Sequence, residues 1–303
     1  MVRRYGIVIV SILLSVWLLD VQGAIGFSKS PKSTSANKKH SSVKAIRTPR
    51  NLVLRSASVL VKDQRTGELL IQKQTEAVLP IASITKLMTA MVVLDARIDL
   101  KESITIEPTD VDTLLYSPSR LPVGTRLSRE NALLLALMAS ENRAANALGR
   151  TYPGGLEAFV NAMNAKAKSL GLFKTRFEDT AGLSSGNTSS AMDLARMVDA
   201  AYHYPLVREF TTREDATIFS GRRTLEFHNT NRLIQNPRWQ IGLSKTGFTN
   251  EAGRCLVMQV SVARRPLLIV LLDAQGKLTR IGDANRIKRW MEEQSLAQQK
   301  RQG

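Results

Sequence analysis

Residues 79–97, LPIASITKLMTAMVVLDAR, predict a helix with almost no polar face at the centre of a folded domain. A proline and small residues precede Ser83, and apolar side chains then recur around most of the helical circumference up to Arg97. Because side chains three positions apart share a helix face, the Lys86 amine is expected beside the Ser83 hydroxyl. The alternative is a serine cap followed by a surface lysine.

Strand patterns flank this helix on both sides. Val53 to Val61 and Leu69 to Lys73 surround the turn-forming residues 63–67 and predict an antiparallel hairpin. Cys255 to Ala263 and Pro266 to Asp273 predict a second pair of strands. Further helices are predicted from three- and four-residue apolar spacing over Ser128–Ala139, Arg143–Arg150, Leu156–Leu170 and Ser190–Tyr204. We therefore predict one α/β (α+β) domain, whose antiparallel sheet is assembled from both chain ends.

The two ends of the chain differ from this domain in composition. Two arginines followed by an apolar run are typical of an export signal over residues 1–23, which we predict to be cleaved after Gly23; the alternative is an uncleaved anchor. Residues 24–50 contain seven lysines and arginines and no acidic residue, which predicts a disordered linker. The domain then covers residues 51–277, and residues 278–303 form a C-terminal helix and tail. Its apolar side chains are expected to face the sheet: Leu278, Ile281, Ile287 and Met291.

The charge and the cysteine count narrow the choice of partners. The 303 residues carry a net charge of +17, to which the linker contributes strongly. An exported protein meets little nucleic acid, so we predict no nucleic-acid partner; the linker either contacts an anionic membrane or wall polymer or is a solvated tether. Cys255 is the only cysteine, so no intramolecular disulfide forms, and its apolar neighbours indicate a buried structural thiol.

A second polar motif follows Ser83 and Lys86 along the chain. Ser140 and Asn142 lie where one predicted helix ends and the next begins, so both side chains are expected to point into a cleft. There the hydroxyl could relay a proton and the amide could hold the substrate or Lys86. The alternative is an ordinary helix N-cap.

A third motif, Lys245-Thr246-Gly247, follows apolar residues typical of a strand at a sheet edge. A cation and a hydroxyl suit a substrate carboxylate, and a glycine lets another backbone approach closely. The alternative is a turn that leaves the strand. Each motif is weak alone, because the linker also contains two S-x-x-K matches, at residues 35–38 and 41–44.

A serine hydroxyl is a poor nucleophile and requires a base that is neutral at the working pH. Lys86 can be neutral if it is buried and if Lys245 lies nearby, since a second cation disfavours its charged form. The positive end of the helix further favours an alkoxide at Ser83. This chemistry requires no histidine, and we predict neither a metal ion nor a cofactor.

In this order, the three motifs resemble the S-x-x-K, S-D-N and K-T-G set of penicillin-binding proteins and serine β-lactamases. The surroundings of Ser83 and of residues 245–255 resemble most closely the low-molecular-mass D-alanyl-D-alanine endopeptidases. The resemblance implies a β-lactamase/transpeptidase-like fold with a helical subdomain. It also implies acylation of Ser83 by peptidoglycan stem peptides, β-lactam inhibition, and an oxyanion hole formed by the N–H groups of Ser83 and Phe248. Cell-wall remodelling in the periplasm is the implied role.

Three alternatives to a D,D-endopeptidase remain. A D,D-carboxypeptidase would remove terminal D-alanine, but such relatives usually carry a further β-rich domain, and only some thirty residues follow Asp273 here. A β-lactamase would require a deacylating carboxylate, and the nearest match, Glu157, follows Asn142 too soon. An inactive wall-binding scaffold would not need to retain the three motifs. Glu141 is a mild departure, since the family motif has aspartate at that position.

Overall fold

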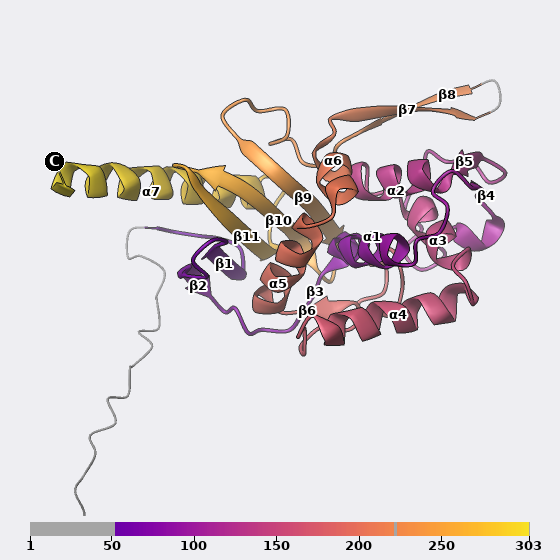
Figure 1. Cartoon of the computed structure of the whole chain (residues 1–303), viewed down its shortest axis with the longest axis horizontal. Coiled ribbons are helices and arrows are strands. Elements are labelled where there is room, and N and C mark those ends of the chain that lie inside the picture. Colours follow the sequence, from indigo (N-terminus) through magenta and orange to yellow (C-terminus); the bar gives the residue numbers. More distant parts are fainter. Residues whose placement is uncertain (1–51, 221–222, 303) are drawn as a thin grey trace, which may run out of the picture. The chain divides into compact units, whose positions relative to one another are not determined.

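The computed structural model describes residues 52–220 and 223–302. A five-stranded antiparallel sheet has the order β2-β1-β11-β10-β9, so strands from both chain ends lie side by side (Figure 1). Its strands are β1 (Ser58–Asp63), β2 (Leu69–Lys73), β9 (Gln240–Thr249), β10 (Gly253–Val262) and β11 (Arg265–Ala274). The predicted sheet is confirmed. The predicted signal peptide and linker, residues 1–23 and 24–50, lie outside the described residues.

Both faces of the sheet are covered, which explains the apolar runs in its central strands. Along β1, Leu60 belongs to the large core under the helices, whereas Val59 and Val61 belong to a smaller core on the other face. Helix α5 (Ala191–Tyr202) packs on the first face and α7 (Thr279–Gln302) lies along β10 and β11 on the second. The strand β9, which carries the third motif, forms one edge of the sheet.

The remaining helices form the helical part of the domain. They are α1 (Lys86–Asp95), α2 (Arg129–Met138), α3 (Asn142–Arg150), α4 (Gly155–Ser169), α6 (Pro205–Thr212) and the short 3-10 helices η1 (Ala82–Thr85) and η2 (Pro108–Asp110). Short strand pairs complete it: β3 (Leu79–Pro80) with β6 (Thr188–Ser189), β4 (Ser103–Thr105) with β5 (Arg126–Ser128), and β7 (Asp215–Ser220) with β8 (Arg223–His228). The sequence patterns had not identified α6 or the β7–β8 hairpin, although a proline at the first turn of α6 is a start signal.

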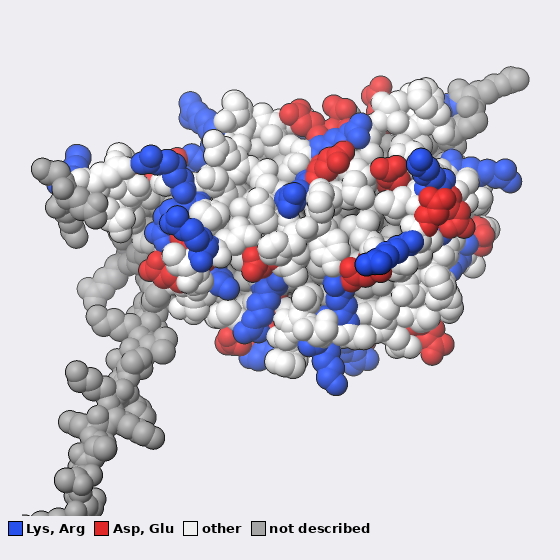
Figure 2. All heavy atoms as spheres, in the orientation of Figure 1, with Lys and Arg blue, Asp and Glu red and all other residues white. Residues whose placement is uncertain are grey.

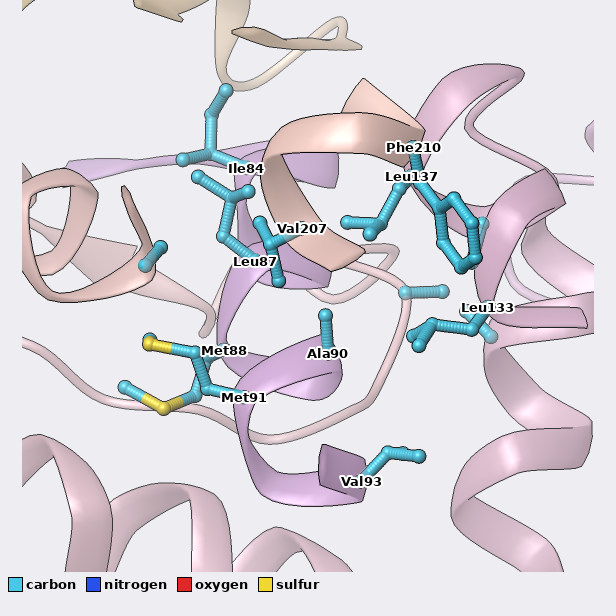
Figure 3. Close-up of a cluster of buried hydrophobic side chains, with 14 of the residues drawn as sticks. Ile84, Leu87, Met88, Ala90, Met91, Val93, Leu133, Leu137, Val207 and Phe210 are labelled. Atoms are coloured by element: carbon cyan, nitrogen blue, oxygen red, sulfur yellow. The ribbon is translucent and has the colours of Figure 1, made fainter. Parts of the chain in front are cut away.

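Helix α1 is buried among the other helices (Figure 3). Its Leu87, Met88 and Met91 side chains are fully buried, and side chains such as Leu133 of α2 and Phe210 of α6 close around it. Burying one such side chain contributes about 1.5–3 kcal/mol. The helix therefore holds its N-terminal end firmly at the edge of the sheet.

The N-terminal strand and the C-terminal helix both begin later than predicted. β1 begins at Ser58 and not at Val53, because the Arg55 and Ser56 N–H groups donate to the Asp283 carboxylate of α7 (3.1 and 2.7 Å). The helix itself begins at Thr279. Leu278 precedes it and is exposed, so its predicted packing on the sheet was wrong; Ile287 and Met291 are buried as predicted.

Lysines and arginines alternate with acidic residues over the face shown in Figure 2. No continuous basic surface covers this face. Within residues 52–220 and 223–302, no helix combines the length and the apolar character that crossing a membrane requires.

Candidate active site

Ser83 lies in the 3-10 turn η1, and the α-helix begins only at Lys86. The predicted helix start at Ser83 was therefore three residues early, because Ala82 has a left-handed φ of +47° that interrupts regular helix. In a 3-10 turn, side chains three positions apart lie directly above one another. Lys86 Nζ consequently lies 2.8 Å from Ser83 Oγ.

Lys86 is completely buried, and its amine contacts two further oxygens. It donates to Asn142 Oδ1 (2.7 Å) and to the Ala181 carbonyl (2.6 Å). A neutral amine has two N–H groups and one lone pair, so these two acceptors leave the lone pair free to accept the Ser83 proton. Burial lowers the pKa of Lys86 to about 7, although nearby carboxylates, chiefly Asp179, oppose this shift. The predicted base is thus placed beside the predicted nucleophile.

The Asn142 amide is held from its other side by a loop that no motif had indicated. Its Nδ2 donates to Ser117 Oγ (2.7 Å), and the Ser117 hydroxyl donates to the Asp112 carboxylate (2.5 Å). Asp112 also accepts the N–H groups of Leu114 and Leu115 (2.9 Å each). This chain of bonds fixes which end of the amide faces Lys86.

Lys245 forms a second buried serine–lysine pair. Its Nζ donates to Ser140 Oγ (2.9 Å) and to the Thr246 carbonyl (3.0 Å). Ser140 has a left-handed φ of +60°, which interrupts regular helix between α2 and α3. Burial lowers the pKa of Lys245 well below its usual range, and repulsion from Lys86 and Arg280 adds to the effect. The two lysines therefore repel each other as expected, while burial is the main cause of the lowered pKa of Lys86.

Two glycines let the backbones meet around Ser83. Gly247, inside β9, lies where an added Cβ would be 2.8 Å from the Ile81 carbonyl and 3.2 Å from the Ser83 nitrogen. Gly182 has a φ of +79°, and a Cβ there would overlap the Ala82 carbonyl at 1.9 Å. The third motif therefore lies within the edge strand β9, and the alternative that it forms a turn was wrong. Phe248, whose N–H is the predicted second oxyanion donor, follows Gly247 in β9, and its side chain is half exposed.

Residues 43–276 match the family model described as D-alanyl-D-alanine carboxypeptidase. The chain belongs to this family. It is 50% identical over 241 residues to a D-alanyl-D-alanine endopeptidase of Pseudomonas aeruginosa, covering 79% of this chain and 78% of the relative. It is 47% identical over 239 residues to a D-alanyl-D-alanine endopeptidase of Escherichia coli, covering 78% of this chain and 77% of the relative.

Solved structures of the D-alanyl-D-alanine carboxypeptidase family have the same fold. The Streptomyces K15 DD-transpeptidase superposes with a TM-score of 0.74 at 25% identity, covering 80% of this chain and 98% of that one. The D-alanyl-D-alanine carboxypeptidase of Mycobacterium tuberculosis superposes with a TM-score of 0.72 at 26% identity, covering 80% of this chain and 94% of that one. The predicted β-lactamase/transpeptidase-like fold is confirmed.

Several residues of this family member had been given no role in the sequence analysis. Ala181 supplies a backbone carbonyl to Lys86, and Thr230 Oγ1 lies 2.6 Å from Thr246 Oγ1. Asn231 donates to Ser244 Oγ (2.8 Å) and so braces β9. Backbone atoms carry no sequence signal, so the role of the Ala181 carbonyl could not be predicted from a motif.

Three other residues lie outside the cluster around Ser83. The Glu141 side chain turns away and accepts the Ser119 hydroxyl (2.5 Å), so the departure from aspartate leaves Ser140 and Asn142 in place. Glu157 is exposed in the first turn of α4. Cys255 is buried, and burial raises the pKa of its thiol to about 11, which confirms a structural thiol. Within the described ranges, no group of three or more metal-ligating side chains is assembled.

The lowered pKa of Lys86 predicts how acylation depends on pH. The amine accepts the Ser83 proton only when neutral, so the acylation rate constant should rise with pH through about 7 and level off above it. Measuring the second-order rate constant for a fluorescent penicillin from about pH 5 to about pH 9 tests this. A rate that falls over this range, or does not change, would contradict Lys86 as the base.

Proposed function

We propose that this chain is a serine D,D-endopeptidase that hydrolyses the D-alanyl cross-links of peptidoglycan. The observation that carries the proposal is the 2.8 Å contact between Ser83 Oγ and the fully buried Lys86 amine. Higher identity to relatives named endopeptidase (50% and 47%) than to a Bacillus subtilis carboxypeptidase (32%) supports the choice of bond.

The first step is acylation. Neutral Lys86 takes the Ser83 proton as Oγ attacks the carbonyl carbon of the D-alanyl bond. The developing oxyanion is stabilised by the N–H groups of Ser83 and Phe248, where one donor contributes roughly 3 kcal/mol. The substrate carboxylate next to the leaving nitrogen is bound by Lys245 and Thr246.

The second step expels the leaving amine, which must gain one proton. We infer that the proton that Lys86 took from Ser83 passes to this nitrogen through the hydroxyl of Ser140, which lies 2.9 Å from Lys245 Nζ, so that Lys86 is neutral again. Water then attacks the Ser83 ester, with Lys86 taking a proton from the water and returning it to Oγ. Glu157, which would have to speed this hydrolysis, is exposed in the first turn of α4, so a β-lactam adduct on Ser83 should be released slowly.

The location of the enzyme is part of the proposal. Its substrate lies in the bacterial cell envelope, so the chain would be exported to the periplasm. The signal-like residues 1–23 and the basic residues 24–50, with their suggested wall or membrane contact, remain predictions from composition.

Digestion of purified cross-linked muropeptide dimers and of free pentapeptides tests the scissile bond. We expect dimers to be converted into monomers, with slower release of D-alanine from pentapeptides. Products are weighed by mass spectrometry, with Ser83→Ala as the matched control. If only D-alanine is released and dimers survive, the chain is the carboxypeptidase alternative; if neither substrate reacts, it is an inactive scaffold.

A further inference from the structure

A pocket of about 430 Å³ lies beside the third motif and is lined by cations. Arg232 comes from the loop after β8, Arg254 from β10, Lys277 from the loop before α7, and Arg280 from the first turn of α7. We call these four residues and the space between them the basic pocket. No aspartate or glutamate lines it, in contrast to the mixed charges on the face in Figure 2.

The charges of the basic pocket are not neutralised within the described parts of the chain. None of its four cations forms an ion pair there, and the Nε of Arg280 has no hydrogen-bond partner. Arg254 lies over the Phe248 ring at 4.2 Å, and Arg280 donates to the Gly247 and Cys255 carbonyls (2.8 and 3.0 Å). Burial, and then repulsion from Arg254, lowers the pKa of Arg280. Such a cluster attracts an anion.

A short chain of contacts joins the basic pocket to the leaving side of the site. Ser140 and Lys245, which serve the leaving group, are 2.9 Å apart, and Lys245 also donates to the Thr246 carbonyl. The Thr246 hydroxyl is 2.6 Å from the Thr230 hydroxyl, and Thr230 lines the basic pocket. A substrate that extends past Thr246 on its leaving side therefore meets these cations next.

The size of the leaving group separates the two activities of the family. A carboxypeptidase releases free D-alanine, whose single carboxylate is already used at Lys245 and Thr246. An endopeptidase releases an amine carried on a second stem peptide, which extends further and carries additional carboxylates. We propose that the basic pocket binds a distal carboxylate of this leaving peptide and so favours cross-linked substrates. This inference rests on the proposed endopeptidase activity.

Two synthetic substrates with the same D-alanyl bond test it. In one, the leaving peptide carries a free distal carboxylate; in the other, that carboxylate is amidated. The wild-type enzyme should prefer the free carboxylate by about tenfold in kcat/KM, mainly through KM. Equal hydrolysis of both would overturn the role of the pocket while the endopeptidase stands. Hydrolysis of neither, with pentapeptide still cleaved, would overturn the proposed function and this inference together.

Variants locate the effect. Arg232→Gln with Lys277→Gln should reduce the preference to about one, because the distal carboxylate loses two of its cations. The matched control, Arg238→Gln with Lys101→Gln, removes the same charge from exposed side chains outside the pocket and should keep the preference. If the pocket variant keeps the preference for the free carboxylate, or if the control variant loses it, the basic pocket does not bind the distal carboxylate. Thermal unfolding checks that each variant folds. If a variant does not fold, the comparison of the two substrates with the wild-type enzyme still tests the proposal.

Discussion

Ser83→Ala should lower hydrolysis of cross-linked dimers by at least about 10⁴-fold, whereas Ser140→Ala should lower it by only about 10–10²-fold. Both serine hydroxyls lie within hydrogen-bond distance of a buried lysine amine, at 2.8 and 2.9 Å, so they form a matched pair. Only Ser83 is placed to form the ester with the substrate. Loss of Ser140 removes a proton relay that water can partly replace.

Steady-state kcat/KM for both variants, with thermal unfolding to check the fold, makes this comparison. Measurable turnover by the Ser83→Ala enzyme would contradict Ser83 as the nucleophile. A loss of activity in Ser140→Ala as large as that expected for Ser83→Ala would contradict the lesser role given to Ser140. Both side chains are small, so neither substitution creates a large cavity.

Lys86→Met should lower acylation by about 10²–10⁴-fold, because the site loses the base beside Ser83. Methionine is apolar and of similar length, so it suits the complete burial of this position. It leaves Asn142 Oδ1 and the Ala181 carbonyl without their donor, and we expect about 1–3 kcal/mol of destabilisation. Any residual acylation should no longer rise through about pH 7.

Lys86→Arg separates base catalysis from charge. An arginine keeps a cation and donors in this position but does not lose its proton in proteins. It should therefore fail as Lys86→Met does. Recovery of activity by arginine, measured as the rate of labelling by a fluorescent penicillin, would show that Lys86 acts through its charge.

The sequence predicted the fold where local patterns agree with the tertiary structure. The apolar circumference of residues 84–94 corresponds to the buried helix α1, and the apolar runs before and after Gly253 correspond to β9 and β10. These patterns are strong because both faces of the elements are covered. The sequence also predicted that strands from both chain ends share one sheet, but it did not predict their order in that sheet.

The features that escaped prediction depend on contacts between distant segments. The left-handed Ala82 is set against Gly182 and Gly247, which lie far along the chain. The bonds from Asp112 through Ser117 to Asn142 join a loop to a helix without any motif. Arg280, in the first turn of α7, donates a hydrogen bond to the Gly247 carbonyl in β9. The apolar pattern of the C-terminal helix gave no indication of this contact.

The central claim is that Ser83, activated by buried Lys86, becomes acylated. The most direct measurement is the intact mass of the wild-type protein after incubation with benzylpenicillin at about neutral pH, followed by peptide mapping. The structure predicts one added penicillin per chain, attached to the peptide that contains Ser83. An unchanged mass, or an adduct located on Ser140 or any other residue, would contradict the account.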